Sequence, residues 1–296
     1  MDTNTCLLCR GTQIEKLFSV KDHGISGEQF HLSECKSCHF RFTSDAPKEI
    51  DIAPYYEASK YISHTEDSAS FVNRIYFGIR DLMLEKKYKL IRKYSSGKNF
   101  LDIGCGLAYF LNHAKSNGNE VLGIEVSEQT AQQARDKFKI QIESPQTFLR
   151  GEIKSKFDVI SLWHVLEHLY NPVDYLNQIK VNMSQDAILV IAVPNHNSFD
   201  GKKYQQYWAG YDVPRHLWHF EAKTLIPWME NQGFKNIGIH ALPFDAFYVS
   251  LLSEQYKGNS LAILRGFFSG MRSYFSSLRN VKTTSSIIYI FKLKNS

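Results

Sequence analysis

The sequence lacks any apolar run long enough to cross a membrane, because the longest, Ala187 to Val193, is far shorter than the roughly 18 residues of a spanning helix. The first residues, Met1 to Thr5, lack the basic and apolar regions of a secretion signal. The low-complexity bias of disordered or collagen-like proteins is also missing, since 43% of the 296 residues are apolar and only 17 are Gly and 8 are Pro. These absences predict a soluble, cytoplasmic protein with a folded core.

A strong charge of one sign is missing as well. The 35 basic and 30 acidic side chains leave a net charge of +5, and the basic residues are scattered along the chain. The densest basic stretch, Glu85 to Lys89, has the spacing of a solvated helix face, which we favour over a nucleic-acid groove. The 20 Phe, 16 Tyr and 4 Trp residues indicate either an aromatic-rich core or a flat or lipid-like substrate.

Cysteine is scarce, yet four of the five cysteines form two pairs with the same spacing. Two residues separate the thiols of each pair, which lets one tight turn aim both sulfurs at the same ion. We therefore predict a structural zinc site with four sulfur ligands and no open position for a substrate. Disulfides are the competing interpretation, but the missing secretion signal favours a metal. The predicted ligands are Cys6, Cys9, Cys35 and Cys38.

The loop between the two cysteine pairs has room for a short hairpin. Alternating Phe18/Val20 and Phe30/Leu32 are the expected strand faces. His31 and His39 flank the second pair and are possible replacement ligands, although nothing in the spacing requires them.

The length and the order of these patterns predict a small module followed by one large domain. Residues 1–50 form the zinc-ribbon-like module. Residues 51–94 form a linker and an amphipathic helix, whose apolar residues recur at helical spacing from Phe71 to Ile91. Residues 95–296 form the large domain, with an aromatic helical insertion at 244–278.

The large domain begins with the pattern of a βαβ nucleotide site. A strand is expected over 100–103, a helix over 107–115 and a second strand over 120–124. Glu125 then follows Gly104 by 21 residues, close to the roughly 20 expected for a ribose-binding carboxylate.

The glycine turn between the first strand and the helix argues against a dinucleotide. Tyr109 stands where a dinucleotide fingerprint has its third glycine, and its bulk blocks the close backbone approach that a pyrophosphate needs. Asp102 precedes the turn, and a carboxylate suits a ligand with an ammonium group better than a phosphate. The pattern therefore favours a cationic nucleoside.

The segment Leu101 to Gly106 resembles the first motif of class I S-adenosylmethionine-dependent methyltransferases. The resemblance implies that Asp102, Gly104 and Gly106 line the methionine portion of S-adenosylmethionine and that Glu125 binds its ribose. It also implies an α/β fold, a Rossmann-like, mostly parallel seven-stranded sheet with helices on both faces and an antiparallel last strand. Together with the four cysteines, the arrangement is similar to methyltransferases that carry a zinc ribbon.

Two later segments agree with this resemblance. A buried strand over 157–162 leads into Trp163 to Leu169, which resembles the H-x-L-E-H segment of small-molecule methyltransferases and adds His164 to the expected cofactor residues. The segment Tyr211 to Phe220 resembles the D-x-P-R-H-L-x-H-F block of the same subgroup. Residues 56–61 look like the aromatic lid of related enzymes, with a packed linker as the plain alternative.

Methyl transfer to a hydroxyl or an acidic carbon needs a base, and histidine suits that role near neutral pH. We expect His216 as the base or substrate anchor, Arg215 as a contact for an anion or carbonyl, and His168 as the alternative base. Structural roles are also open. His164 and His168 are four residues apart and are expected to share a helical face, where one of them could simply cap backbone carbonyls, and Arg215 could be a buried partner of Asp212 that holds the loop.

The predicted function is methyl transfer from S-adenosylmethionine to oxygen or carbon of a small-molecule acceptor. A nucleic-acid methyltransferase is less favoured, because Ser161 to His164 replaces the Asn/Asp-Pro-Pro block of base amino-group methylases and Cys105 is the one cysteine of the large domain. A non-catalytic adaptor that binds the cofactor is another alternative. Residues 261–278 alternate apolar side chains with arginines, as in a lid over an apolar substrate, which we favour, or in a helix at a membrane surface.

Overall fold

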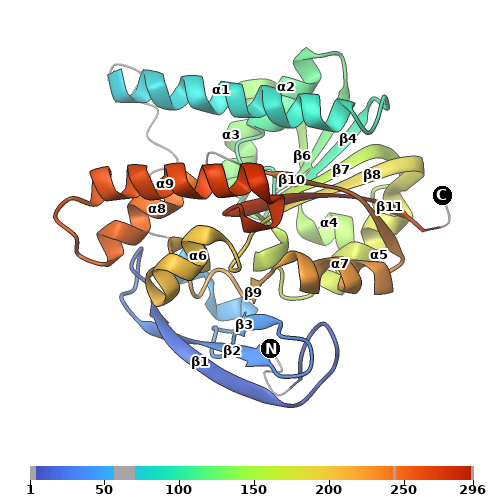
Figure 1. Cartoon of the computed structure of the whole chain (residues 1–296). Helices are drawn as coiled ribbons and strands as arrows, with labels where there is room; N and C mark the ends of the chain where they lie inside the picture. The colour runs from blue at the N-terminus through green and yellow to red at the C-terminus, as the bar shows by residue number, and fades with distance from the viewer. Residues whose placement is uncertain (1–4, 57–70, 243–244, 295–296) are drawn as a thin grey trace. The chain divides into compact units, whose positions relative to one another are not determined.

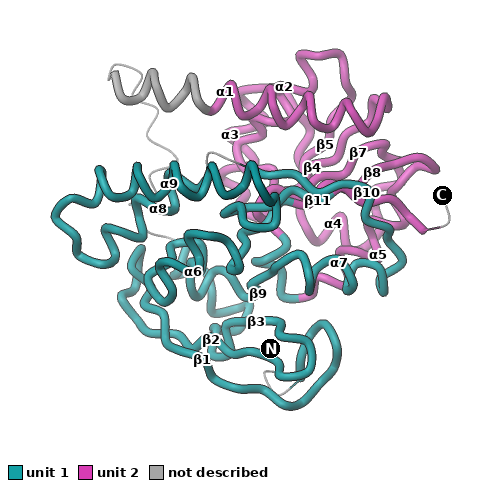
Figure 2. Tube along the Cα trace, in the orientation of Figure 1, with its two compact units in different colours: residues 1–61, 166–170, 192–289 teal, residues 62–165, 171–191, 290–296 magenta. Residues whose placement is uncertain are grey.

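The computed structural model describes residues 5–56, 71–242 and 245–294 (Figure 1). Its contacts divide the chain into two compact units, coloured separately in Figure 2. Unit 1 comprises residues 1–61, 166–170 and 192–289, and unit 2 comprises residues 62–165, 171–191 and 290–296. Of the expected lid over residues 56–61, all but Tyr56 lies outside the described residues.

Unit 1 begins with the expected hairpin. Strands β1 (Ile14–Lys21) and β2 (Gln29–Cys35) pair antiparallel, with Phe18 opposite Leu32 and Val20 opposite Phe30. The side chains of Val20, Phe30 and Leu32 are buried, so the predicted alternation of strand faces is confirmed.

The hairpin belongs to a four-stranded sheet whose last strand comes from far along the chain. The order is β1-β2-β3-β9, with β3 at Arg41–Thr43 and β9 at Trp218–His219. Strand β9 pairs antiparallel with β3, which places Trp218 opposite Phe42. The hairpin also shares its hydrophobic cluster with Tyr204, Trp208 and Tyr211, so its core is completed by residues some 170 positions away on the chain.

The rest of unit 1 is mainly helical. Its elements are the short 3-10 helices η1 (Glu49–Asp51), η2 (Ala53–Tyr55), η4 (Leu166–His168), η5 (Gln205–Tyr207), η6 (Ala209–Tyr211) and η7 (Val281–Thr283), the helices α6 (Phe199–Tyr204), α7 (Ala222–Asn231), α8 (Asp245–Tyr256) and α9 (Ala262–Arg279), and strand β10 (Phe234–Ala241). Helices α8 and α9 correspond to the expected helical insertion, and they lie side by side in Figure 1.

Unit 2 carries the expected alternation of strands and helices. Its elements are α1 (Phe71–Arg92), β4 (Asn99–Ile103), α2 (Tyr109–Ser116), β5 (Glu120–Ile124), α3 (Glu128–Phe138), β6 (Gln141–Glu143), α4 (Pro145–Leu149), β7 (Phe157–Trp163) and α5 (Pro172–Asn182). Strand β4 pairs in parallel with both β5 and β7, and β5 pairs in parallel with β6. Helix α2 begins two residues later than predicted, because Ala108 has a left-handed backbone (φ 57°) that an α-helix cannot include.

The strands form one seven-stranded sheet in the order β10-β11-β8-β7-β4-β5-β6, with β8 at Met183–Pro194 and β11 at Ser286–Leu293. The predicted α/β fold with a seven-stranded sheet is therefore confirmed. The chain enters the sheet at β4 and then builds outward on both sides of it, so β4 and β7 flank a switch point. In open α/β sheets, ligands bind at the carboxyl ends of the strands at such a point.

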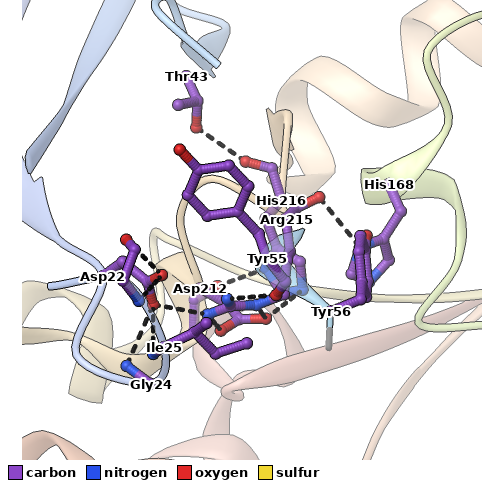
Figure 3. A network of polar contacts seen from close by, with 12 residues as sticks. Asp22, Gly24, Ile25, Thr43, Tyr55, Tyr56, His168, Asp212, Arg215 and His216 are labelled. Carbon is purple, nitrogen blue, oxygen red and sulfur yellow. Dashed lines mark hydrogen bonds and ion pairs between the residues drawn. The ribbon is translucent and has the colours of Figure 1, made fainter. Parts of the chain in front are cut away.

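A buried arginine ties the segments of unit 1 together (Figure 3). The Arg215 guanidinium contacts Asp212 at 2.6 Å and Asp22 at 3.1 Å, and it donates to the Tyr55 carbonyl at 3.0 Å. The side chains of Arg215 and Asp22 are 3% and 0% exposed. Burial raises the pKa of Asp22, but the Ser26 N–H and the Arg215 guanidinium outweigh it and hold that pKa below its ordinary value. Both members of the pair are thus charged at neutral pH.

We expect Arg215→Gln to lower the free energy of unfolding by about 3 kcal/mol at pH 7, because Asp22 then stays buried without its cation. The folded-state pKa of Asp22 is depressed, so the pair stabilises the fold above the unfolded pKa and this contribution is lost as the pH falls. The difference in the free energy of unfolding between variant and wild type should therefore become smaller below about pH 4. Urea titrations at several pH values measure this. The exposed Arg150→Gln serves as the control, and an equal loss there would contradict the assignment.

Candidate functional site

The four paired cysteines converge at one end of the hairpin of unit 1. Their sulfurs all lie within 4.8 Å of one another, with Cys6 and Cys38 at 3.6 Å and Cys9 and Cys35 at 3.5 Å. These separations are too long for a disulfide, whose sulfurs are about 2.05 Å apart. Four sulfurs at this spacing match the donor set of a tetrahedral structural zinc site.

The two cysteine pairs stand on turns of the same geometry. In each turn the first cysteine exchanges backbone bonds with residues four and five positions later: Arg10 N–H donates to the Cys6 carbonyl at 3.0 Å, and His39 N–H donates to the Cys35 carbonyl at 2.7 Å. Arg10 and His39 both have left-handed backbones, each with φ 61°. The matched turns present both pairs of sulfurs to the same point. His39 takes part through its backbone, and its ring contacts Glu34.

In unit 2 the glycine turn follows β4 directly. Gly104 and Gly106 have positive φ values of 69° and 53°. A Cβ on Gly104 would lie 2.4 Å from a methyl group of Val165, whereas a Cβ on Gly106 would meet nothing within 4 Å. Gly104 is therefore required by packing, and Gly106 leaves open space where the backbone can approach a ligand.

Glu125 lies at the carboxyl end of β5, beside this turn. Its two carboxylate oxygens accept hydrogen bonds from the backbone N–H of Gly106 at 2.8 Å and of Ser127 at 3.0 Å. These bonds fix the orientation of the carboxylate, and each oxygen keeps a second lone pair for a ligand hydroxyl. Ser127 also caps α3 by accepting from the Thr130 N–H.

Asp102 lies on the neighbouring strand β4 and is 3% exposed. It accepts a 2.6 Å hydrogen bond from Ser161, its partner in the register of β4 and β7. Burial raises the pKa of Asp102 to about 7. The sequence alone did not indicate the role of Ser161, because only the strand register brings it to Asp102.

The segment after β7 differs from one expectation. His164 has a left-handed backbone with φ 57°, and the 3-10 helix η4 begins only at Leu166. The expectation that His164 and His168 share a helical face is therefore wrong, because a left-handed residue interrupts the chain between β7 and η4. His164 itself lies at the carboxyl end of β7, directly after the strand that neighbours β4.

In unit 1, the rings of buried His216 and half-buried His168 lie against each other. Their ring centroids are 4.6 Å apart and the rings stand nearly perpendicular. His168 Nδ1 lies 3.0 Å from the Arg215 carbonyl, and His216 Nδ1 lies 3.0 Å from the Gly210 carbonyl. A carbonyl can only accept, so Nδ1 of each ring is the donor in this contact. Burial, followed by the charge of His216, lowers the pKa of His168 to about 4.

The surroundings of this pair add three functional groups. The Tyr56 hydroxyl lies 3.0 Å from His168 Nδ1 (Figure 3). Glu167, which is 1% exposed, offers a carboxylate oxygen within 4.8 Å of a ring nitrogen of each histidine, so the three side chains are a chemically possible metal-ligand set. Arg215, expected to contact a substrate, instead engages Asp212, Asp22 and the Tyr55 carbonyl, which is the structural alternative left open above.

Comparisons with known proteins agree with this geometry. A sequence profile of the family described as "Methyltransferase domain" matches residues 76–239. The chain is 28% identical over 158 residues to a tRNA U34 carboxymethyltransferase of Colwellia psychrerythraea, covering 49% of this chain and 47% of that protein. It is also 28% identical over 193 residues to a ubiquinone biosynthesis O-methyltransferase of Rhodopseudomonas palustris, covering 60% of this chain and 74% of that protein.

Among solved structures, a SAM-dependent methyltransferase from Archaeoglobus fulgidus superposes with a TM-score of 0.49 and 19% identity, covering 72% of this chain and 94% of that one. The chain spans about half the length of the tRNA-modifying relatives that it matches. The family profile covers more than half of the 296 residues and includes β4, Glu125 and the segment after β7. The chain therefore belongs to the methyltransferase domain family.

Proposed function

We propose that this protein transfers a methyl group from S-adenosylmethionine to oxygen or carbon of a small-molecule acceptor. One observation carries the proposal: two carboxylates, Asp102 and Glu125, end adjacent parallel strands on either side of a glycine turn that faces open space at Gly106. A cationic amino acid joined to a ribose needs this combination of an acid for an ammonium, an acid for vicinal hydroxyls, and an approachable backbone.

Each group of the cofactor has a chemically matched residue in unit 2. Asp102 pairs with the ammonium group, and Glu125 accepts hydrogen bonds from the ribose hydroxyls with the lone pairs that Gly106 and Ser127 leave available. Gly104, Gly106 and His164 line the loops that follow β4 and β7. When bound, S-adenosylmethionine supplies an electrophilic methyl group on a sulfonium.

His168 and His216 are the residues proposed to contact the methyl acceptor. Their Nδ1 atoms face backbone carbonyls, so Nε2 is the atom of each ring that would take a proton from a hydroxyl or acidic carbon. The lowered pKa of His168, about 4, keeps that imidazole neutral at neutral pH. Arg215 is a positioning residue, because it fixes the loop from Asp212 to His216 and its own carbonyl orients His168.

Two groups of relatives, named for different substrates, bear on the identity of the methyl acceptor. The relatives named ubiquinone biosynthesis O-methyltransferase are matched over 47% to 79% of their length, and those named tRNA U34 carboxymethyltransferase over about half. The small net charge and scattered basic residues also favour a small molecule over a polyanion. The four cysteines are proposed to hold a structural zinc ion, since four protein ligands leave no open position.

Glu125→Ala should weaken binding of S-adenosylhomocysteine at least about tenfold, or about 1.4 kcal/mol, because the ribose hydroxyls lose their acceptor. Isothermal titration calorimetry of the full chain measures the affinity. Glu120→Ala, on the exposed start of the same strand, is the matched control and should bind like wild type.

No binding by a folded wild-type chain would refute the methyltransferase proposal. Binding without turnover of any acceptor would favour a cofactor-binding adaptor. Phenolic hydroxyl compounds and an unmodified tRNA transcript, tested in parallel for methyl incorporation, separate the two acceptor classes, and turnover of the tRNA alone would contradict the small-molecule assignment.

Binding of S-adenosylhomocysteine should become about tenfold tighter between pH 6 and pH 8, because the ammonium group pairs with ionised Asp102 and the pKa of Asp102 is about 7. Asp102→Asn should bind weakly and lose this pH dependence. Calorimetric titrations across the range test both statements. A wild-type affinity that does not change with pH would show that Asp102 does not contact the ammonium group.

The purified chain should contain about one zinc ion, measured by mass spectrometry of the metal. Cys35→Ser should lower the zinc content and the melting temperature by several degrees, because three ligands hold the metal less tightly and folding is coupled to its binding. Cys105→Ser, which changes the one cysteine outside the cluster, should retain full zinc. Full zinc retention in Cys35→Ser would exclude the four-sulfur site.

A further inference from the structure

Helix α9 of unit 1 buries its small residues. The side of the helix that faces the protein carries Ala, Gly and Ser only: Ala262, Gly266, Ser269, Gly270, Ser273 and Ser277. Contact with α8 is close, since a Cβ on Gly266 would lie 2.7 Å from Leu251 Cα and a Cβ on Gly270 would lie 2.8 Å from Phe247 Cα. Helix α9 lies beside α8 (Figure 1), and its inner face has no room for large side chains.

The large apolar residues of α9 and of Leu261, which precedes it, point the other way. They are between 53% and 77% exposed: Leu261, Ile263, Leu264, Phe267, Phe268, Phe275 and Leu278. With successive residues about 100° apart, those within the helix fall on the side opposite the Gly and Ser stripe. A helix of a globular protein normally buries its large apolar side chains and exposes polar ones, so this helix has the reverse arrangement.

The charges of α9 have one sign. Arg265, Arg272 and Arg279 are spaced seven residues apart, so they form one exposed row along the edge of the apolar face. The helix contains no Asp or Glu. None of the three arginines takes part in an ion pair within the part of the chain that the structure describes. Cationic side chains beside Phe and Leu are the composition of helices that lie in a membrane interface.

We propose that the apolar face and arginine row of α9 bind the surface of an anionic phospholipid bilayer. Among the described helices none has the length and apolarity to span a bilayer, so the helix would lie in the plane of the interface. The apolar residues from Ile263 to Leu278 extend over about 22 Å, which is longer than a small acceptor would cover. A second copy of the chain would bring its own arginine row against this one, and like charges disfavour that pairing.

The test is co-sedimentation of the full chain with vesicles of phosphatidylcholine alone or with about one third phosphatidylglycerol. S-adenosylmethionine is left out, so the result does not depend on the proposed methyl transfer. We expect binding to the anionic vesicles that weakens at least about tenfold when the salt rises from about 0.05 to about 0.5 M.

Two sets of substitutions separate the apolar and cationic contributions. Arg265→Gln/Arg272→Gln/Arg279→Gln should weaken binding to anionic vesicles at least about tenfold, and Phe267→Ser/Phe268→Ser should weaken it for both lipid compositions. Matched controls are Arg150→Gln and Ile50→Ser, which replace an exposed arginine and an exposed apolar residue elsewhere. All four variants replace exposed side chains, and their melting temperatures show whether they are folded.

Three results would overturn the proposal. The first is no binding of wild type to anionic vesicles. The second is equal loss in the control variants. The third is a wild-type dimer in analytical ultracentrifugation that Phe267→Ser/Phe268→Ser converts to a monomer, which would assign the face to a second copy. If wild type binds no vesicles and Phe267→Ser/Phe268→Ser lowers the melting temperature, the apolar face of α9 is assigned to a contact with another segment of the chain.

Discussion

A buried guanidinium organises unit 1. Arg215 binds Asp22 of the hairpin turn, the carbonyl of Tyr55 and Asp212, residues separated by up to 193 positions from the arginine itself. Removing charges from water is costly, and the cost is offset here because several acceptors surround one planar donor group. The same loop supplies the carbonyls of Gly210 and Arg215 that fix both histidines, so the tautomers at the proposed acceptor site depend on this ion-pair network.

The two units prepare their polar groups in the same way, through the backbone. In unit 2, amide N–H groups orient the Glu125 carboxylate, and in unit 1, carbonyl groups orient His168 and His216. Backbone groups cannot change rotamer, so these side chains are held before any ligand arrives. Asp102 differs, because a side-chain hydroxyl is its partner and its burial brings its pKa near neutrality.

The features that short sequence patterns predicted were local ones. The spacing of the cysteines, the alternation in the hairpin and the strands β4, β5 and β7 each depend on a few neighbouring residues. The features that these patterns did not predict depend on contacts between distant parts of the chain or on left-handed backbone conformations. Strand β9 has only two residues and forms because β3 offers an unpaired edge, and the turn at His164 needs a left-handed residue that no helical pattern reveals.

The composition of the four-stranded sheet has a consequence for biosynthesis. During synthesis, strands β1 to β3 and all four cysteines leave the ribosome before β9 exists, since β9 is at Trp218–His219. Until then the open edge of β3 and the apolar side of the hairpin lack the partners that later cover them. An edge of this kind can pair with other chains. A nascent polypeptide of this protein thus passes through an interval in which the unfinished sheet has an unpaired edge.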